Sequence, residues 1–381
     1  MIFFSFGKTV AAETLGAPSL PRSCFCGCGV PNDRSSSLRW FKSGRPRIRT
    51  RILFIMTKSW VPHPRRVFVF AARVGNHDPQ TAPVIRLAAL VLLLLAPAVA
   101  VAQTHFNGAK ALDYAREFVS IGPRWPTSPG HLKAEAYLRD HFKHDQLEED
   151  TFTASTPIGP VDMRNFIVRF QGKKDGVIVL ATHYETNYWL KNINFVGAND
   201  GGSTTGLLMA IADQLRALTA GGKKLDGYSV WLLFDDGEES IEPTWTDSDS
   251  TYGTRHLAAK WAGDGTLAKI KAFILTDMIG DKDLDIQRET QSTGWLVDLV
   301  RQAAKKYGDE KYFFKEEMNV QDDHLPFVKR GVPSIDIIDL TYGPNNSYHH
   351  TDKDTMDKIS AHSLTIDGDV ILETIRLVGL R

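Results

Sequence analysis

The chain has 381 residues, and its 45 Lys and Arg residues balance 45 Asp and Glu residues to a formal net charge of zero at pH 7. A balanced charge provides no general attraction for a polyanion, so we expect no nucleic-acid partner. The length would allow two domains, but the N-terminal quarter of the chain lacks the pattern of a folded domain.

Residues 1–85 are rich in Arg, Pro and Ser, without a sustained hydrophobic period, and they contain all three cysteines of the chain. The stretch from Met56 continues through basic residues into the apolar run 87–96 and the small residues that follow it. A basic flank, a short apolar core and an Ala-x-Ala ending are typical of a secretory signal, and this core is too short to span a bilayer permanently. We therefore predict an untranslated or disordered extension over 1–55, a signal-peptide region over 56–102, and export of the remainder to the periplasm or the medium.

The remaining segment, residues 103–381, contains no cysteine, so a hydrophobic core and not disulfides has to stabilise it. Strand-like and helix-like patterns alternate along it, and several strand-like runs are apolar throughout. This pattern is typical of a mostly parallel sheet that helices cover on both faces. We therefore predict one three-layer α/β/α domain, monomeric and without a membrane span.

The expected elements begin with two helices over 107–120 and 130–144. Two strands follow over 163–171 and 176–184, and the intervening Gly172-Lys-Lys-Asp175 is expected to join them as a hairpin. The other expected elements are, in order, a helix over 201–217, a strand over 228–236, a helix over 251–262, a strand over 270–278, a helix over 293–307, a short helix over 323–330, a strand over 334–340 and a helix over about 360–378.

Four acidic residues around one glycine end the expected strand over 228–236. The run from Trp231 reads Trp-Leu-Leu-Phe-Asp-Asp-Gly-Glu-Glu, and Gly237 allows the sharp turn that places Glu238 and Glu239 at the carboxyl edge of the strand. Two adjacent carboxylates at a strand end are costly unless a cation neutralises one of them. We interpret one Glu as a ligand of a divalent metal and the other as a proton-transfer group; a solvated acidic turn is the alternative.

Further residues of metal-ligand type lie next to the other expected strands, where sheets of this class form their sites. They are His183 and Glu185 after the strand over 176–184, Asp200 before the helix over 201–217, Asp277 at the end of the strand over 270–278, and His349 and His350 after the last strand. Five separate segments therefore supply polar groups to one edge of the sheet, which favours a metal site over a solvated turn.

Imidazole and carboxylate ligands without thiolates suit zinc, and a catalytic zinc keeps one position open. The minimal ligand set consists of Asp200, Glu239 and His350. His183 and Asp277 would complete a two-metal site in which Asp200 is the bridging ligand. Glu238 is then free to act as general base and afterwards as general acid.

Five motifs in order resemble those of the M28 family of zinc aminopeptidases. They are His183-Tyr-Glu185, Gly197-Ala-Asn-Asp200, Phe234 to Glu239, Leu275-Thr-Asp277 and His350-Thr-x-x-Asp354. Within that family the chain is most similar to the animal-type glutaminyl-peptide cyclotransferases. This likeness rests on Asp249 to Lys260, Gln321 to Phe327, Arg330-Gly-Val-Pro333 and Trp245.

The resemblance implies an M28-like catalytic domain over 103–381 with one zinc on Asp200, Glu239 and His350. It makes Glu238 the proton shuttle, places Asp277 and Asp322 in a hydrogen-bonding network, and makes Trp245 a pocket residue. His183 corresponds to a peptidase ligand that such cyclases retain, so its presence does not decide between one zinc and two.

The implied activity is conversion of an N-terminal glutamine of a peptide into pyroglutamate with release of ammonia. An M28-type aminopeptidase that releases N-terminal residues is the alternative, because the same residues serve both reactions. A binding protein that has lost catalysis is a third alternative.

This chain departs from the cyclase pattern at several positions. His349 stands where cyclases usually have a Trp, so one wall of the glutamine pocket differs. An insertion over 240–246 shifts Trp245 by about one residue, and Glu185 replaces the usual Asp of the first motif. Trp189 is a further pocket candidate, and His324 is expected either to pack beneath the acids at 322–323 or to act directly in catalysis.

Overall fold

The structure is a computed structural model and describes residues 104–381. The extension predicted over 1–55 and the signal-peptide region predicted over 56–102 lie outside the described residues. Within the described part of the chain, no helix combines the length and apolar character that crossing a bilayer requires.

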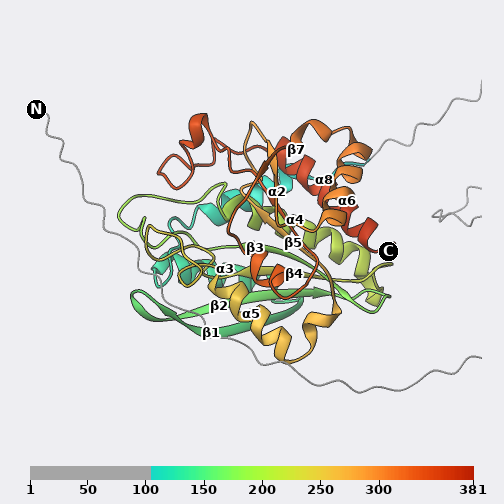
Figure 1. Cartoon of the computed structure of the whole chain (residues 1–381), viewed down its shortest axis with the longest axis horizontal. Coiled ribbons are helices and arrows are strands. Elements are labelled where there is room, and N and C mark those ends of the chain that lie inside the picture. The colour runs from blue at the N-terminus through green and yellow to red at the C-terminus, as the bar shows by residue number, and fades with distance from the viewer. Residues whose placement is uncertain (1–103) are drawn as a thin grey trace, which may run out of the picture. The chain divides into compact units, whose positions relative to one another are not determined.

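An eight-stranded mixed sheet forms the middle layer (Figure 1). In spatial order its strands are β1 (Gln146–Thr156), β2 (Gly159–Phe170), β4 (Ser229–Asp235), β3 (Val177–His183), β5 (Ile270–Asp277), β8 (Ser334–Ile338), β6 (Ile286–Glu289) and β7 (Phe313–Met318). The central strands β4, β3, β5 and β8 run parallel, whereas β1 and β2 form an antiparallel edge and β6 runs antiparallel to β8. The predicted α/β fold with a mostly parallel sheet is confirmed.

Helices cover both faces of the sheet. One face packs against α2 (Gly108–Val119), α3 (Pro129–Phe142), α4 (Gly202–Thr219), α6 (Gly294–Tyr307) and α8 (Ala361–Val378), and the other against α5 (Tyr252–Gly263) and α7 (Leu325–Val328). Short 3-10 helices occupy Ala220–Gly222, Thr266–Lys269, Glu310–Tyr312 and Pro344–Asn346.

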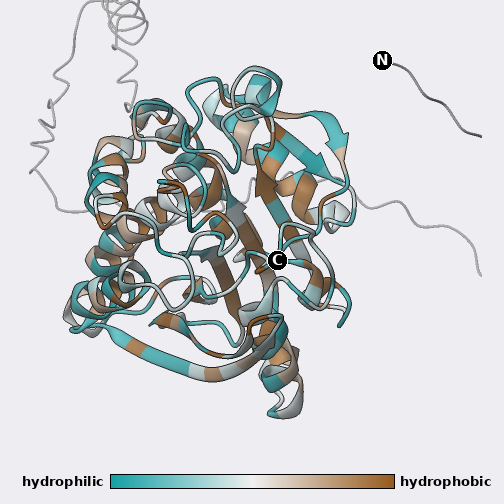
Figure 2. Cartoon of the chain, turned by 90° about the vertical axis from the view of Figure 1, so that its left-hand side faces the viewer, coloured by the Kyte–Doolittle hydropathy of each residue, from teal (hydrophilic) through white to brown (hydrophobic). Residues whose placement is uncertain are grey.

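The central strand β3 explains why the sequence pattern indicates this architecture. Ile178 and Leu180 pack into the core beneath the larger helical layer, while Val177 and Val179 pack into the core beneath α5. Every residue of β3 is buried, so the strand is apolar on both faces and shows no alternation. Figure 2 shows such apolar strands, in brown, inside a shell of helices with hydrophilic outer faces.

The predicted hairpin between the strands over 163–171 and 176–184 is wrong. β4 lies between β2 and β3, and β2 forms its hairpin with β1, where Thr156 pairs with Gly159. The sequence pattern does not predict β1, because this edge strand is largely polar and only two of its positions are buried. It also misses β6 and β7, which are short and mixed in polarity. The other expected helices and strands are found, with small shifts at their ends.

Candidate active site

Three adjacent parallel strands end at one place in the fold. β3, in the middle, ends at His183, β5 ends at Asp277, and β4 ends at Asp235 just before the acidic turn. The carboxyl ends of parallel strands meet at the same sheet edge, so chain segments about fifty residues apart or more become neighbours. The predicted convergence of the polar strand ends is therefore found.

The turn after β4 requires glycine at position 237, and it is followed by the two carboxylates of Glu238 and Glu239. Gly237 has φ of 73°, and a Cβ at this position would lie 2.6 Å from the Met163 sulfur, so a side chain would be both strained and obstructed. The backbone N–H of Glu239 donates to the Glu185 carboxylate at 3.0 Å. This bond fixes the backbone directly after Glu238. The side chains of Glu238 and Glu239 are both buried.

Asp354 ties the last loop of the site to the segment before α4. Its carboxylate accepts hydrogen bonds from the backbone N–H groups of Asn199 at 2.8 Å and Asp200 at 3.2 Å, and from the Tyr342 hydroxyl at 2.6 Å. Burial, followed by the nearby Asp200 carboxylate, raises the pKa of Asp354 to about 7. Asp354 thus joins the loop that carries His350 to the segment that carries Asp200. This contact gives a structural reason for the spacing between His350 and Asp354 in the sequence.

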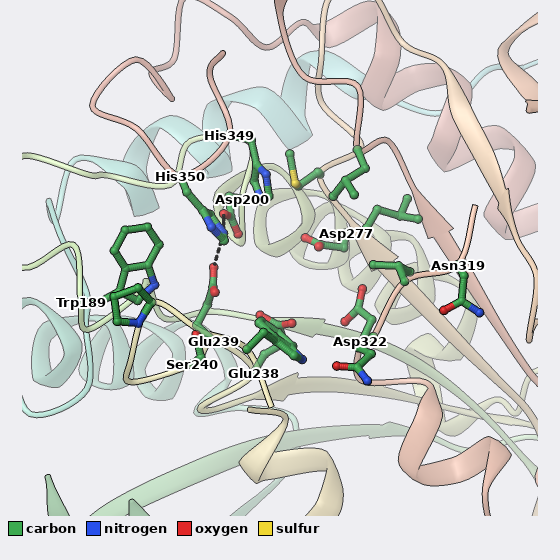
Figure 3. A pocket seen from close by; sticks show the side chains of 17 residues that line it. Trp189, Asp200, Glu238, Glu239, Ser240, Asp277, Asn319, Asp322, His349 and His350 are labelled. Carbon is green, nitrogen blue, oxygen red and sulfur yellow. Dashed lines mark hydrogen bonds and ion pairs between the residues drawn. The ribbon is translucent and has the colours of Figure 1, made fainter. Parts of the chain in front are cut away.

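The three residues of the minimal ligand set meet around one imidazole nitrogen. His350 Nε2 lies 3.1 Å from Glu239 Oε1 and 3.3 Å from Asp200 Oδ2, as Figure 3 illustrates. The Asn187 amide donates to the other Glu239 oxygen and also lies 3.4 Å from His350 Nε2. The sequence interpretation missed Asn187, although its place four residues after the end of β3 could have indicated it.

The second ligand set shares Asp200 with the first. His183 Nε2 lies 3.1 Å from Asp200 Oδ1 and 3.4 Å from Asp277 Oδ1, and these three residues each offer a ligand atom within 4.8 Å of the other two. Each oxygen of Asp200 therefore faces a different imidazole. This arrangement is compatible with either one metal ion or two.

Unpaired buried atoms indicate that these residues fit a cation. Both ring nitrogens of His183, Asp200 Oδ2 and Asp277 Oδ1 are buried and have no hydrogen-bond partner among the described residues. Buried polar atoms without partners are costly and uncommon in folded proteins. Nitrogen and oxygen atoms that converge without hydrogen bonds are the donor set that zinc binds.

Glu238 is buried in the site, and its ion-pair partner among the described residues is His183, whose Nδ1 lies 4.0 Å from Glu238 Oε2. Burial, followed by the Glu239 carboxylate, raises the pKa of Glu238 well above its ordinary value, against the opposing effect of His183. Burial likewise raises the pKa of Asp322 well above its ordinary value, with Asp277 adding to the effect. These carboxyl groups therefore hold protons more strongly than exposed carboxyl groups.

A cavity of about 380 Å³ includes the three residues of the candidate ligand set in its lining. It is lined by Trp189, Asp200, Glu238, Glu239, Ser240, Pro243, Trp245, Asp277, Met278, Asn319, Val320, Gln321, Asp322, Ile338, Leu340, His349 and His350. Of the candidate residues named from the sequence, His183, Glu185 and His324 do not line it, and the others do. The Asp249 carboxylate accepts bonds from the backbone N–H groups of Ile241 and Glu242, which orders the segment that presents Trp245.

His349 and Trp189 form one wall of this cavity. The rings of His349 and His350 have centroids 3.8 Å apart, and Trp189 meets His350 edge-on at 5.8 Å. Burial, followed by the adjacent His350 ring, lowers the pKa of His349 to about 4, so His349 is a neutral wall at physiological pH. The Asn346 amide lies 3.2 Å from His349 Nδ1 and orients the ring.

Asp277 and Asp322 lie next to each other on the opposite side of the cavity (Figure 3). Beneath them, His324 is fully buried and does not line the cavity. Its two nitrogens lie 3.1 Å from Glu289 and 3.6 Å from Asp336. The structure therefore places His324 in the packing beneath the acids, away from any cavity-bound molecule.

Removing divalent cations with a chelator is expected to lower the thermal unfolding midpoint by several degrees, and added zinc is expected to restore it. A ligand that binds only the folded state stabilises it by about 2.7 kcal/mol at a hundredfold excess over its Kd. Thermal scans of the chelated, zinc-loaded and magnesium-loaded chain measure this effect. Magnesium should restore less, because it prefers six oxygen ligands. Equal midpoints with chelator and with zinc would contradict a metal centre here.

Comparison with known proteins gives a consistent family assignment. The profile of peptidase family M28 matches residues 165–375. The glutaminyl-peptide cyclotransferase-like protein of Bos taurus is 31% identical over 256 residues, which are 61% of this chain and 66% of that protein. The crystal structure of an Acidobacteriales bacterium glutaminyl cyclase is 58% identical, with a TM-score of 0.71 over 75% of this chain and 99% of that one.

A peptidase is also among the similar solved structures. A zinc-dependent exopeptidase from Parabacteroides distasonis is 25% identical, with a TM-score of 0.62 over 73% of this chain and 99% of that one. Solved structures of both a cyclase and an exopeptidase are thus similar to this chain. From its motifs, fold and profile match, this chain belongs to peptidase family M28.

Proposed function

We propose that this chain is a zinc-dependent glutaminyl-peptide cyclotransferase, which converts an N-terminal glutamine of a peptide into pyroglutamate and releases ammonia. The observation behind the proposal is the position of Glu238, a buried carboxyl group in the cavity wall between the ligand Glu239 and the acid Asp322 (Figure 3). The similarity to solved and curated cyclases supports it.

The cavity suits a short polar side chain that has to fold back on its own amine. Its volume is at the lower end of the range for small-molecule sites, and Trp189 and Trp245 provide apolar walls. The reaction is intramolecular, so its main requirement is that one conformer of the glutamine is held. The carboxyl groups of Asp277 and Asp322 can accept hydrogen bonds from the amine and the side-chain amide.

Proton transfer is assigned to Glu238. The α-amine nitrogen attacks the γ-carbonyl carbon, Glu238 accepts a proton from that nitrogen, and the same proton then goes to the side-chain nitrogen as it leaves as ammonia. A carboxyl group with a raised pKa can hold the transferred proton between the two steps of general acid–base catalysis. Zinc held by Asp200, Glu239 and His350 would polarise the γ-carbonyl oxygen.

An aminopeptidase is the second candidate, and the second ligand set favours it. His183 and Asp277 could hold a second metal with Asp200 as the shared ligand, and two-metal sites are found in aminopeptidases. In that case Glu238 would activate a water molecule against the first peptide bond.

Mass spectrometry of two matched peptides distinguishes these functions. The zinc-loaded full chain is incubated with a Gln-initiated peptide and with the same peptide starting with Leu. A cyclase is expected to remove one ammonia from the first and leave the second intact, because only glutamine can close the five-membered ring. Release of a free N-terminal residue from either peptide would identify an aminopeptidase, and no change in either would reject both enzymatic functions.

The cellular setting is part of the same proposal. The signal-like segment over 56–102 supports export, and the substrates would then be N-termini of exported or extracellular peptides. We propose that the exported domain acts as a monomer.

A further inference from the structure

A second cavity adjoins the candidate active site. It has a volume of about 300 Å³ and shares the lining residues Trp245, Gln321 and Asp322 with the first cavity, so the two cavities are adjacent. Its other walls come from the segment before α5, the first turns of α5, and α7 with the residues after it. Neither cavity shares a lining residue with the third, which lies over β1 and β2.

The two adjoining cavities have opposite charge. The first is lined by five carboxyl groups and by no Lys or Arg residue. The second is lined by three cationic side chains, Arg255, Lys329 and Arg330, and by only two acids, Asp247 and Asp322.

Within the described residues, the two arginines of the second cavity donate hydrogen bonds to backbone oxygens and not to carboxylates. Arg255 donates only to the backbone carbonyls of Ser250 at 3.0 Å and Ser248 at 3.2 Å, and Arg330 only to that of Pro326 at 2.9 Å. Across residues 104–381, neither arginine forms an ion pair with a carboxylate. A guanidinium group has five N–H donors, so both retain donors for a carboxylate ligand.

Lys329 differs from the two arginines. It lies 3.3 Å from the Asp247 carboxylate, and both side chains are more than half exposed. An exposed pair of this kind is weak and leaves little net charge. Arg255 and Arg330 are therefore the groups of this cavity that an anionic side chain would meet.

We propose that the second cavity is a subsite for an acidic residue close behind the N-terminal glutamine of the substrate, an inference that rests on the cyclase function proposed above. A peptide amine belongs in the carboxylate-lined cavity, and an extended chain advances by roughly 3.3 Å per residue, so positions two to four reach the adjoining one. Asp or Glu there pairs with Arg255 and Arg330. The enzyme thus selects glutaminyl peptides with an acidic segment after the first residue.

The test compares peptides that differ only in charge. Gln-initiated peptides carry Glu, Gln or Lys singly at positions two, three and four, and kcat/KM is measured at low and high salt. We expect about a tenfold preference for Glu over Gln at one of these positions, mainly through KM, and a smaller preference at high salt because salt screens exposed charges. The R255Q/R330Q double variant should lose this preference and process the all-Gln peptide as the unmodified chain does.

Two further variants test whether the preference for Glu peptides comes from the second cavity or from the overall charge of the protein. R301Q removes an exposed arginine on α6 that has no carboxylate partner within the described residues and lies outside both cavities, and it should keep the full preference. R255E/R330E should instead favour Lys over Glu at the same position. Circular dichroism checks that each variant is folded. Equal kcat/KM for the Glu and Gln peptides at all three positions overturns the subsite.

A binding measurement separates this proposal from that of the function. The zinc-loaded E238Q variant is titrated with the same peptides by calorimetry, which requires no turnover. Tighter binding of Glu peptides to this variant, abolished by adding R255Q/R330Q, together with no pyroglutamate formation by the unmodified chain, would leave the subsite standing and reject the cyclase. Pyroglutamate formation without any charge preference in binding or turnover would reject the subsite alone.

Discussion

Replacing Glu238 by Gln is expected to lower kcat for pyroglutamate formation by about 10²- to 10⁴-fold, the usual contribution of a positioned general acid–base group. Gln has nearly the same shape as Glu but cannot accept the amine proton and return it to the leaving nitrogen. Since Glu238 lies outside the minimal ligand set, the variant should bind zinc with the same stoichiometry as the unmodified chain. Single-turnover kinetics and elemental analysis measure the two properties.

Glu239→Gln is the matched control, because it makes the same chemical change one residue further along the turn. Glu239 lies 3.1 Å from His350 Nε2, so its neutralisation should weaken zinc binding as well as activity. Loss of zinc from Glu238→Gln, or full zinc retention in Glu239→Gln, would contradict the assignment of the two glutamates. Normal turnover by Glu238→Gln would reject its role in proton transfer.

Replacing Arg124 by Met is expected to destabilise the fold by about 3–5 kcal/mol, because several buried carbonyl oxygens lose their donor and each unsatisfied group costs about 1–3 kcal/mol. Arg124 is fully buried, and its guanidinium group donates to the backbone carbonyls of Tyr184 at 2.9 Å, Val196 at 2.6 Å, Gly197 at 3.2 Å and Gly122 at 3.3 Å. Met fills similar space without a donor and leaves these buried oxygens unpaired, which is costly.

The same replacement should loosen the metal site. Arg124 joins the segment after β3 to the turn that precedes Asp200, so weaker zinc binding is expected as well as lower stability. Burial lowers the pKa of Arg124 to about 10, which still leaves it charged at neutral pH. Urea unfolding at constant zinc concentration gives the stability change. If Arg124→Met does not fold, Arg124→Lys can be measured instead. Lys keeps the positive charge but has fewer N–H donors, so the losses of unfolding free energy and of zinc affinity should be smaller.

Arg116→Met on α2 is the control for this experiment. Arg116 pairs with Asp113 at 2.7 Å, but both side chains are more than half exposed, and such pairs contribute about 0–1 kcal/mol. The structure therefore predicts a large difference between two Arg-to-Met changes eight positions apart in the sequence. Equal unfolding free energies for Arg124→Met and Arg116→Met would show that the buried guanidinium is not needed to hold the site loops.

The sequence predicts the central strands and most helices because burial imposes a local pattern. β3, β4 and β5 are buried on both faces and are therefore continuously apolar, and their ends are visible as abrupt changes to polar residues. Polar residues at those ends have to share one edge of a parallel sheet. The convergence of Asp200, Glu239 and His350 could thus be predicted without coordinates.

The edge of the sheet could not be predicted in the same way. β1 has one face in solvent and a polar composition, so no apolar period distinguishes it from a loop. The pairing of β2 with β4 instead of β3 depends on contacts between segments far apart in the chain. A glycine-containing turn between two strand-like runs is therefore weak evidence for a hairpin between them.

By itself, the sequence determined the class of the fold, its family motifs and the chemical type of the site, since these follow from local patterns of burial and from residue identity. Only the tertiary structure decided that Asn187 contacts Glu239, that Arg124 holds the loops behind Asp200, and that Arg255 and Arg330 line a basic cavity beside an acidic one. Asn187 and Arg124 lie in loops outside the family motifs, and Arg255 and Arg330 lie in motif segments that do not by themselves indicate a cavity. Their roles come from what packs next to them, and packing between distant segments is what a local pattern does not contain.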